Sequence, residues 1–183
     1  EPLELVNTAA KVPRPFSWYF KNQKPATDLN QALYAVEPHP DGLGVTFQFS
    51  DGKVRARKEF KFGKDSYLSQ VSAEVVEGGR TVPSWISWRG GFGDFAVAGS
   101  ASSGSTIYYD QAAAKLVKNG HKAAADGPVS ASGAFPFAGL EDRYFAAVFL
   151  PEGSTVDAVT FSDRVRTVVD ESEEPFAGAA LSD

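Results

Sequence analysis

The sequence contains no cysteine and no methionine. Without cysteine the chain can form no disulfides, no thiolate nucleophile and no zinc–thiolate site. The missing initiator methionine leads us to expect an excised or incomplete piece of a longer protein. No apolar run approaches the roughly 20 residues that a membrane-spanning helix needs, and no signal peptide is visible.

Basic residues are few and gather in no patch. The chain has 18 Lys and Arg against 23 Asp and Glu, which gives a formal net charge of -5. An acidic domain repels phosphate backbones and anionic headgroups, so we expect neither nucleic-acid binding nor polybasic membrane binding.

The residue types that carry catalysis are also sparse. The only histidines, His39 and His121, lie in turn-like contexts far apart in the sequence, which predicts no metal site and no cofactor. No nucleophile-elbow pattern occurs. Glu141 and Asp142 are adjacent, so in an extended chain they point in opposite directions and cannot act on one bond. We therefore predict no catalytic residues and no enzyme activity.

Apolar residues, by contrast, are abundant and alternate along the chain. They make up 43% of the sequence and include 14 Phe, which is enough for a sizeable core. Period-2 alternation dominates, and no linker or internal repeat divides the chain. The pattern predicts an all-β fold, an antiparallel β-sandwich with one or two short helical turns, in a single domain over residues 1–183.

The clearest local signal is a hairpin at Asp51-Gly52. A two-residue turn there pairs Phe49 with Val54 and brings the apolar faces of both strands together. Lys58 is the one inconsistency, because this register places it on the apolar face opposite Val45.

Other strands follow from turn residues. A strand over 66–77 ends at a Gly78-Gly79 turn that places Glu77 opposite Arg80, and a strand over 81–88 returns with an irregular start at Pro83. Near the end, strands over 154–161 and 164–169 form a predicted hairpin around Ser162-Asp163, followed by an acidic loop over 170–174. Residues 111–118 fit a short helix capped by Asp110 or a strand, and the pattern leaves both open.

Two groups of residues are candidates for a role. Trp85 and Trp88 are three residues apart on one strand, so they lie on opposite faces and at most one is in the core. Tyr108 and Tyr109 likewise divide between faces. Exposed rings of this kind form a candidate binding surface for sugar, peptide or lipid.

The second group is a charged corner, Gly139, Asp142, Arg143, Tyr144 and Phe145. Its charges precede an apolar run that ends at Pro151. We expect these charges to brace a corner before a buried strand from Tyr144 to Leu150, which is a structural role.

Several segments resemble one family. The segment 60–67 with its following strand, the segment 106–110, and the corner 139–145, which has the form G-x-x-D-K/R-Y-F, are similar to the large periplasmic domain of bacterial YidC-type membrane protein insertases. The resemblance implies a β-supersandwich similar to galactose mutarotase, a strand at Lys115–Lys118, and a place on the periplasmic side of the bacterial inner membrane. It implies no catalysis. The implied role is to support insertion and folding of inner-membrane proteins through contacts with Sec translocon accessory subunits and substrate membrane proteins.

Two other classes of function stay open. One is a carbohydrate-binding or mutarotase-like β-sandwich module. A mutarotase needs a carboxylate base and imidazoles converging in one cleft, so simple sugar binding is the better version of this alternative. The other is a purely structural spacer.

Overall fold

The fold was obtained as a computed structural model, which describes residues 5–6, 13–89, 92–93, 104–124, 126–127, 129–133, 135–151, 156–166 and 173–182. Within these residues the regular secondary structure is almost entirely strand, and the strand pairings are antiparallel, as predicted for an all-β sandwich. The chain forms two compact units, a continuous unit (Trp18–Ser84) and a discontinuous unit (Glu1–Ser17 with Trp85–Asp183).

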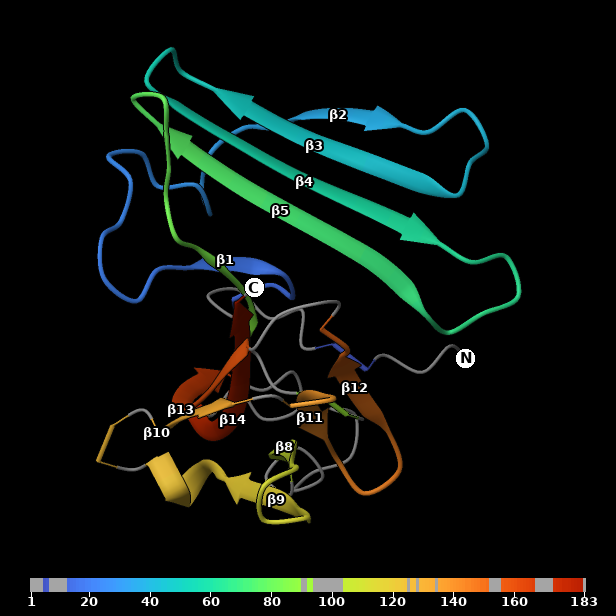
Figure 1. The fold of residues 1–183 in the computed structure, drawn as a ribbon, viewed down its shortest axis with the longest axis vertical. Coiled ribbons are helices and arrows are strands. Elements are labelled where there is room, and N and C mark those ends of the chain that lie inside the picture. The colour runs from blue at the N-terminus through green and yellow to red at the C-terminus, as the bar shows by residue number, and fades with distance from the viewer. Residues whose placement is uncertain are drawn as a thin grey trace. The chain divides into compact units, whose positions relative to one another are not determined.

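The continuous unit contains one antiparallel sheet whose strands are neighbours in chain order (Figure 1). This order follows from short turns, which join consecutive strands edge to edge. The strands are β2 (Ala35–Pro38), β3 (Gly44–Ser50), β4 (Val54–Phe62), β5 (Ser69–Glu77) and β6 (Arg80–Thr81).

One face of this sheet carries the core of the continuous unit. Trp18 packs on it, and its indole N–H donates to the Tyr34 hydroxyl at 2.9 Å, which in turn donates to the Leu29 carbonyl at 2.9 Å. The segment before β2 therefore covers the sheet, and burial alternates over the first four residues of β4. The buried members of the cluster are Trp18, Leu29, Val54, Ala56 and Val75.

The hairpin of β3 and β4 forms, but its register differs from the predicted one by two residues. Phe49 pairs with Ala56 instead of Val54. Gly52 and Lys53 occupy the turn because the Asp51 carboxylate accepts hydrogen bonds from the N–H groups of Lys53 at 2.9 Å and Val54 at 2.7 Å. Alternation restricts the register only to steps of two, so both registers bury the same faces.

The next turn is confirmed, whereas the strand after it is not continuous. Gly78 and Gly79 have positive φ and place Glu77 opposite Arg80, as predicted. The predicted strand over 81–88 is interrupted before β7 (Trp85–Trp88), which belongs to another sheet. Pro83 lies in the interruption and has no N–H to donate to a ladder.

The remaining strands form two further sheets. A five-stranded sheet has the order β1-β7-β14-β13-β10, and a four-stranded sheet has the order β12-β11-β8-β9. The strands not yet bounded are β1 (Ser17–Tyr19), β8 (Ser105–Asp110), β9 (Lys115–Gly120), β10 (Val129–Gly133), β11 (Ala138–Glu141), β12 (Ala146–Phe149), β13 (Val156–Arg166) and β14 (Glu173–Ser182). A short 3-10 helix, His121–Ala124, follows β9.

The open choice at 111–118 is decided in favour of a turn and a strand. Gln111–Ala114 form the turn, and β9 pairs with β8 along its length. The Asp110 carboxylate accepts from the Ala113 N–H at 3.0 Å, so it caps the turn instead of a helix.

The predicted hairpin around Ser162-Asp163 is wrong. β13 runs through both residues and pairs with β14 from Asp157↔Ser182 to Arg166↔Glu173. Glu173 and Glu174, predicted in an acidic loop, are strand residues. A tight hairpin turn needs positive φ, which Gly adopts more readily than Ser or Asp. The chain therefore continues as one long strand through Ser162 and Asp163.

Lys58, the inconsistency noted in the sequence, is accommodated by an aromatic ring. It lies on the core face opposite Phe47, and its Nζ is 4.4 Å from the centroid of Trp18. The ring stabilises the ammonium group through a cation–π contact. Burial acts in the other direction and lowers the pKa of Lys58 to about 8.

This shift predicts a stability that depends on pH. The unfolded chain holds the Lys58 proton up to the usual pKa of 10.5, whereas the folded chain releases it near 8. The free energy of unfolding should therefore rise between about pH 8 and 10.5, by up to about 3 kcal/mol. Urea titrations of the wild type and Lys58→Met across this range measure it, and the substitution should remove the rise.

Lys53→Met is the matched control, because the Lys53 side chain is 70% exposed. It should retain the rise in unfolding free energy. A flat profile in the wild type, or an equal loss in both variants, would contradict the assignment.

Candidate functional site

The two tryptophans of the candidate binding surface pack inside the discontinuous unit. Trp85 is 7% exposed, so its ring belongs to the core. Trp88 lies on the opposite face of β7 and is half-buried, with ring centroids of Phe16 at 5.7 Å and Phe92 at 5.4 Å. Both faces of β7 are thus covered, which the spacing of three did not reveal.

The two tyrosines lie on β8, in the other sheet of the unit. Tyr108 is half-buried and its ring centroid is 4.7 Å from that of Phe135. Tyr109 is half-buried as well, and its N–H donates to the Phe137 carbonyl at 3.4 Å. A binding role for these four rings stays a prediction, and it would fall to the half-buried Trp88, Tyr108 and Tyr109, since Trp85 is in the core.

The charged corner is a tight connection between β11 and β12. The Asp142 carboxylate accepts from the N–H groups of Tyr144 at 2.7 Å and Phe145 at 2.6 Å, and the Asp142 N–H donates to the Phe145 carbonyl at 2.9 Å. Three hydrogen bonds therefore hold the corner on this one residue. Arg143 and Tyr144 point into solvent, and Tyr144 is 75% exposed.

Two glycines allow close packing around the corner. Gly139 pairs with Val148, and a Cβ at residue 139 would overlap the Ala147 carbonyl of β12. Gly93 has φ of +138 and packs against the Asp142 carboxylate, where a Cβ would also collide. The G-x-x-D spacing thus reflects close approach of two strands and the cap that joins them.

The strand after the corner is not buried, contrary to prediction. β12 begins at Ala146 and is the edge of its sheet. Ala147 and Phe149 pack inward, whereas Val148 and Leu150 are 42% and 51% exposed. An apolar run cannot by itself distinguish a central strand from an edge strand.

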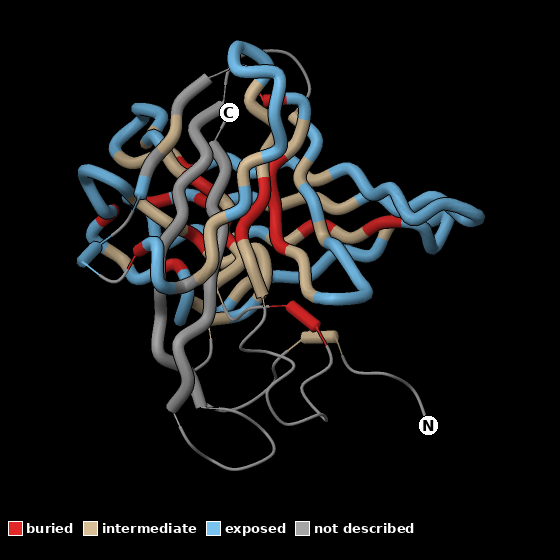
Figure 2. The backbone as a smooth tube through the Cα atoms, turned by 90° about the horizontal axis from the view of Figure 1, so that it is seen from below, coloured by how far each residue is buried: buried red, intermediate tan, exposed pale blue. Residues whose placement is uncertain are grey.

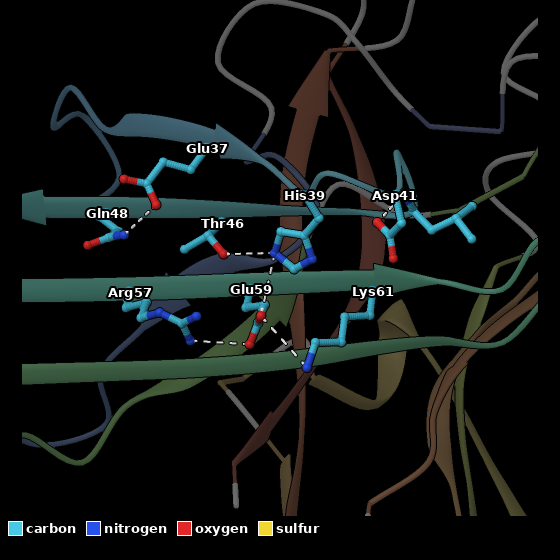
Figure 3. Close-up of polar contacts among 9 residues, drawn as sticks. Glu37, His39, Asp41, Thr46, Gln48, Arg57, Glu59 and Lys61 are labelled. Carbon is cyan, nitrogen blue, oxygen red and sulfur yellow. Dashed lines mark hydrogen bonds and ion pairs between the residues drawn. The ribbon is translucent and has the colours of Figure 1, made fainter.

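A polar cluster on the continuous unit was not predicted. His39, directly after β2, lies beside Thr46 of β3 and Glu59 of β4 (Figure 3). Its Nε2 is 3.1 Å from Thr46 Oγ1 and 3.5 Å from Glu59 Oε1. Arg57 and Lys61 approach the same carboxylate at 3.3 and 3.7 Å.

The geometry of this cluster does not form a nucleophile relay. In a relay, one imidazole nitrogen is hydrogen-bonded to the nucleophilic hydroxyl and the other nitrogen to the carboxylate. In His39 the same nitrogen, Nε2, faces both Thr46 and Glu59. Thr46 is 4% exposed, and the other side of the ring rests on Gly44, where a Cβ would overlap it. The cluster ties β2, β3 and β4 together.

Electrostatics support this structural interpretation. The hydrogen bond from Arg57, with the nearby charges of Arg57, Lys61 and His39, holds the pKa of Glu59 below its usual value. Sequence reasoning missed the cluster because it assigned the hairpin register two residues away. In the observed register Thr46 is directly opposite Glu59, and Glu37 of β2 is opposite Thr46.

The described residues offer no metal centre, since no three His, Asp or Glu side chains among them gather closely enough to hold an ion. The side chain of His121 lies outside the described residues. Among the described helices, none has the length and apolarity to cross a membrane.

A family model described as the YidC periplasmic domain matches residues 1–175, which include parts of both compact units. Neither the curated proteins nor the solved structures yield a match.

We predict that Asp142→Ala destabilises the chain by about 1–3 kcal/mol, because two backbone N–H groups lose a charged acceptor. Thermal unfolding measures the loss. Arg143→Ala is the control and should change stability by less than about 0.5 kcal/mol, since Arg143 is exposed. Intact stability of Asp142→Ala would exclude the bracing role.

We also predict that the polar cluster weakens in acid. The folded-state pKa of Glu59 is below 4.5, so its stabilisation is present above pH 4.5 and disappears as the pH falls through the folded value. Glu59→Gln should therefore lower stability at pH 7 and bring the variant closer to wild type below pH 4. Urea unfolding at both pH values checks this, with the exposed Glu74→Gln on β5 as control.

Proposed function

Because the chain belongs to the YidC periplasmic domain family, we propose that it is the non-catalytic extracytoplasmic domain of a bacterial membrane protein insertase. The match over residues 1–175 is the observation that carries this proposal. The domain would lie on the periplasmic side of the inner membrane. There it would support insertion and folding of inner-membrane proteins through protein–protein contacts.

The polar chemistry of the described residues supports a role without catalysis. The buried or half-buried polar groups of the His39 cluster are occupied with one another, and the Asp142 carboxylate is occupied with backbone N–H groups. A catalytic group must be able to reach a substrate. These groups instead fix strands and corners, so the proposed function belongs to the exposed surface.

Charge supports a protein partner in place of a nucleic acid. The net charge of -5 disfavours phosphate backbones and favours contact with basic or neutral protein surfaces. We propose that these partners are accessory subunits of the Sec translocon and membrane protein substrates. We further propose that the corner 139–145 is a structural element of the domain and that the sequence 1–183 acts as a single domain of a longer protein.

Photo-crosslinking in the intact parent protein tests this proposal. A crosslinking amino acid is placed at exposed positions on each unit, such as Arg55 and Tyr144. We expect adducts with translocon subunits or with newly inserted inner-membrane proteins. The control positions are the buried Val54 and Val75, which should give none.

A sugar titration separates the proposal from its main alternative. Calorimetry with a panel of oligosaccharides should show no saturable heat for the wild-type chain. Clear sugar affinity that is lost in Trp88→Ala, together with absent protein adducts, would overturn the proposal.

A further inference from the structure

Four large apolar side chains are exposed together at one end of the continuous unit. We call them the apolar tip: Leu43, Phe62, Tyr67 and Leu68, which are 37%, 46%, 108% and 66% exposed. They lie on or beside the loops that join β2 to β3 and β4 to β5, and both loops are at the same end of the sheet (Figure 1). The loops are almost wholly exposed (Figure 2).

The tip extends the apolar face of the sheet beyond its core. The Phe62 N–H donates to the Leu43 carbonyl at 2.8 Å, so these two residues are neighbours across β3 and β4. Phe62 stacks on Phe60 with centroids 6.4 Å apart, and Phe60 meets Phe47 edge to face at 5.9 Å. A row of aromatic rings thus leads from the covered part of the sheet to the exposed end.

The loop that carries Tyr67 and Leu68 is held in shape. Ser66 Oγ accepts from the Leu68 N–H at 3.0 Å, and a Cβ on Gly63 would meet the Ser66 Cβ at 2.8 Å. The loop is therefore tightly folded, yet it leaves its two large side chains in solvent. Exposed apolar groups gathered at one end of a sheet favour contact with proteins or membranes.

The charges around the tip are balanced. Lys61 and Lys64 stand beside it together with Asp41 and Asp65, and Lys61 forms an ion pair with Glu59 at 3.7 Å. A rim with equal charges of both signs matches headgroups that carry a phosphate and an ammonium. It offers no excess of positive charge for anionic lipid.

We propose that the apolar tip enters the headgroup region of a zwitterionic phospholipid bilayer. Tyr67 supplies an amphipathic ring, which favours the membrane–water interface, and Phe62, Leu43 and Leu68 supply apolar area. This inference rests on the proposed function, which places the domain beside the inner membrane. A few inserted side chains give weak, reversible contact, so the tip orients a domain that is held near the membrane by other means.

Flotation of the 183-residue chain with phosphatidylcholine vesicles tests the proposal. Tyr67→Ser combined with Leu68→Ser should reduce the vesicle-bound fraction at least fivefold, whereas binding of the wild type should change little with added salt. Leu33→Ser is the matched control, since Leu33 belongs to the same unit and is 93% exposed away from the tip. It should bind within twofold of wild type. Both variants should keep the wild-type unfolding temperature, because the replaced side chains are exposed.

A second variant reports the depth of the contact. Tyr67→Trp should show a blue shift of the added tryptophan emission and quenching by brominated lipid, and Leu33→Trp should show neither. The proposal is overturned if the double variant floats as the wild type does, if Leu33→Ser weakens binding equally, or if binding requires anionic lipid. Loss of protein adducts in the double variant without any vesicle binding would assign the tip to a protein partner instead. Vesicle binding can fail while the translocon adducts persist, so the two proposals fail separately.

Discussion

The ladder between β3 and β4 sorts the side chains of the continuous unit onto two faces, and the other features of that unit depend on this separation. On one face the alternation brings Val54 and Ala56 under Trp18 and extends through Phe60 to the apolar tip. On the other face it brings Thr46 opposite Glu59, where His39 joins them. A shift of one residue would exchange the two faces, which strongly disfavours such a shift.

Each face holds one ionisable group whose pKa its neighbours shift. On the apolar face Lys58 is partly desolvated, and the Trp18 ring offsets some of the cost. On the polar face the Glu59 carboxylate lies among Arg57, Lys61 and His39, which favour its charged form. The sheet is thus stabilised through side chains from strands that are distant in sequence.

The charged corner joins its two strands through backbone contacts. Gly139 permits the close approach of β11 and β12, and Asp142 caps the connection between them. These constraints concern backbone geometry, and none of them requires a substrate. These contacts support our proposal that the corner has a structural role, and that partners contact exposed surfaces elsewhere.

The sequence by itself was sufficient for the all-β class, the Gly78-Gly79 turn and the resemblance to the family, because alternation and turn residues act over short distances. It could not decide the register at Asp51, the continuous strand through Ser162 and Asp163, or the edge position of β12. Those outcomes depend on which strand lies beside which, and several pairings satisfy the same local pattern. The environments of Lys58 and His39 likewise appeared only in the tertiary structure, because Trp18 and Glu59 reach them from other parts of the chain. Desolvation and charge pairing are properties of neighbours in space, and the one-dimensional order of residues does not specify them.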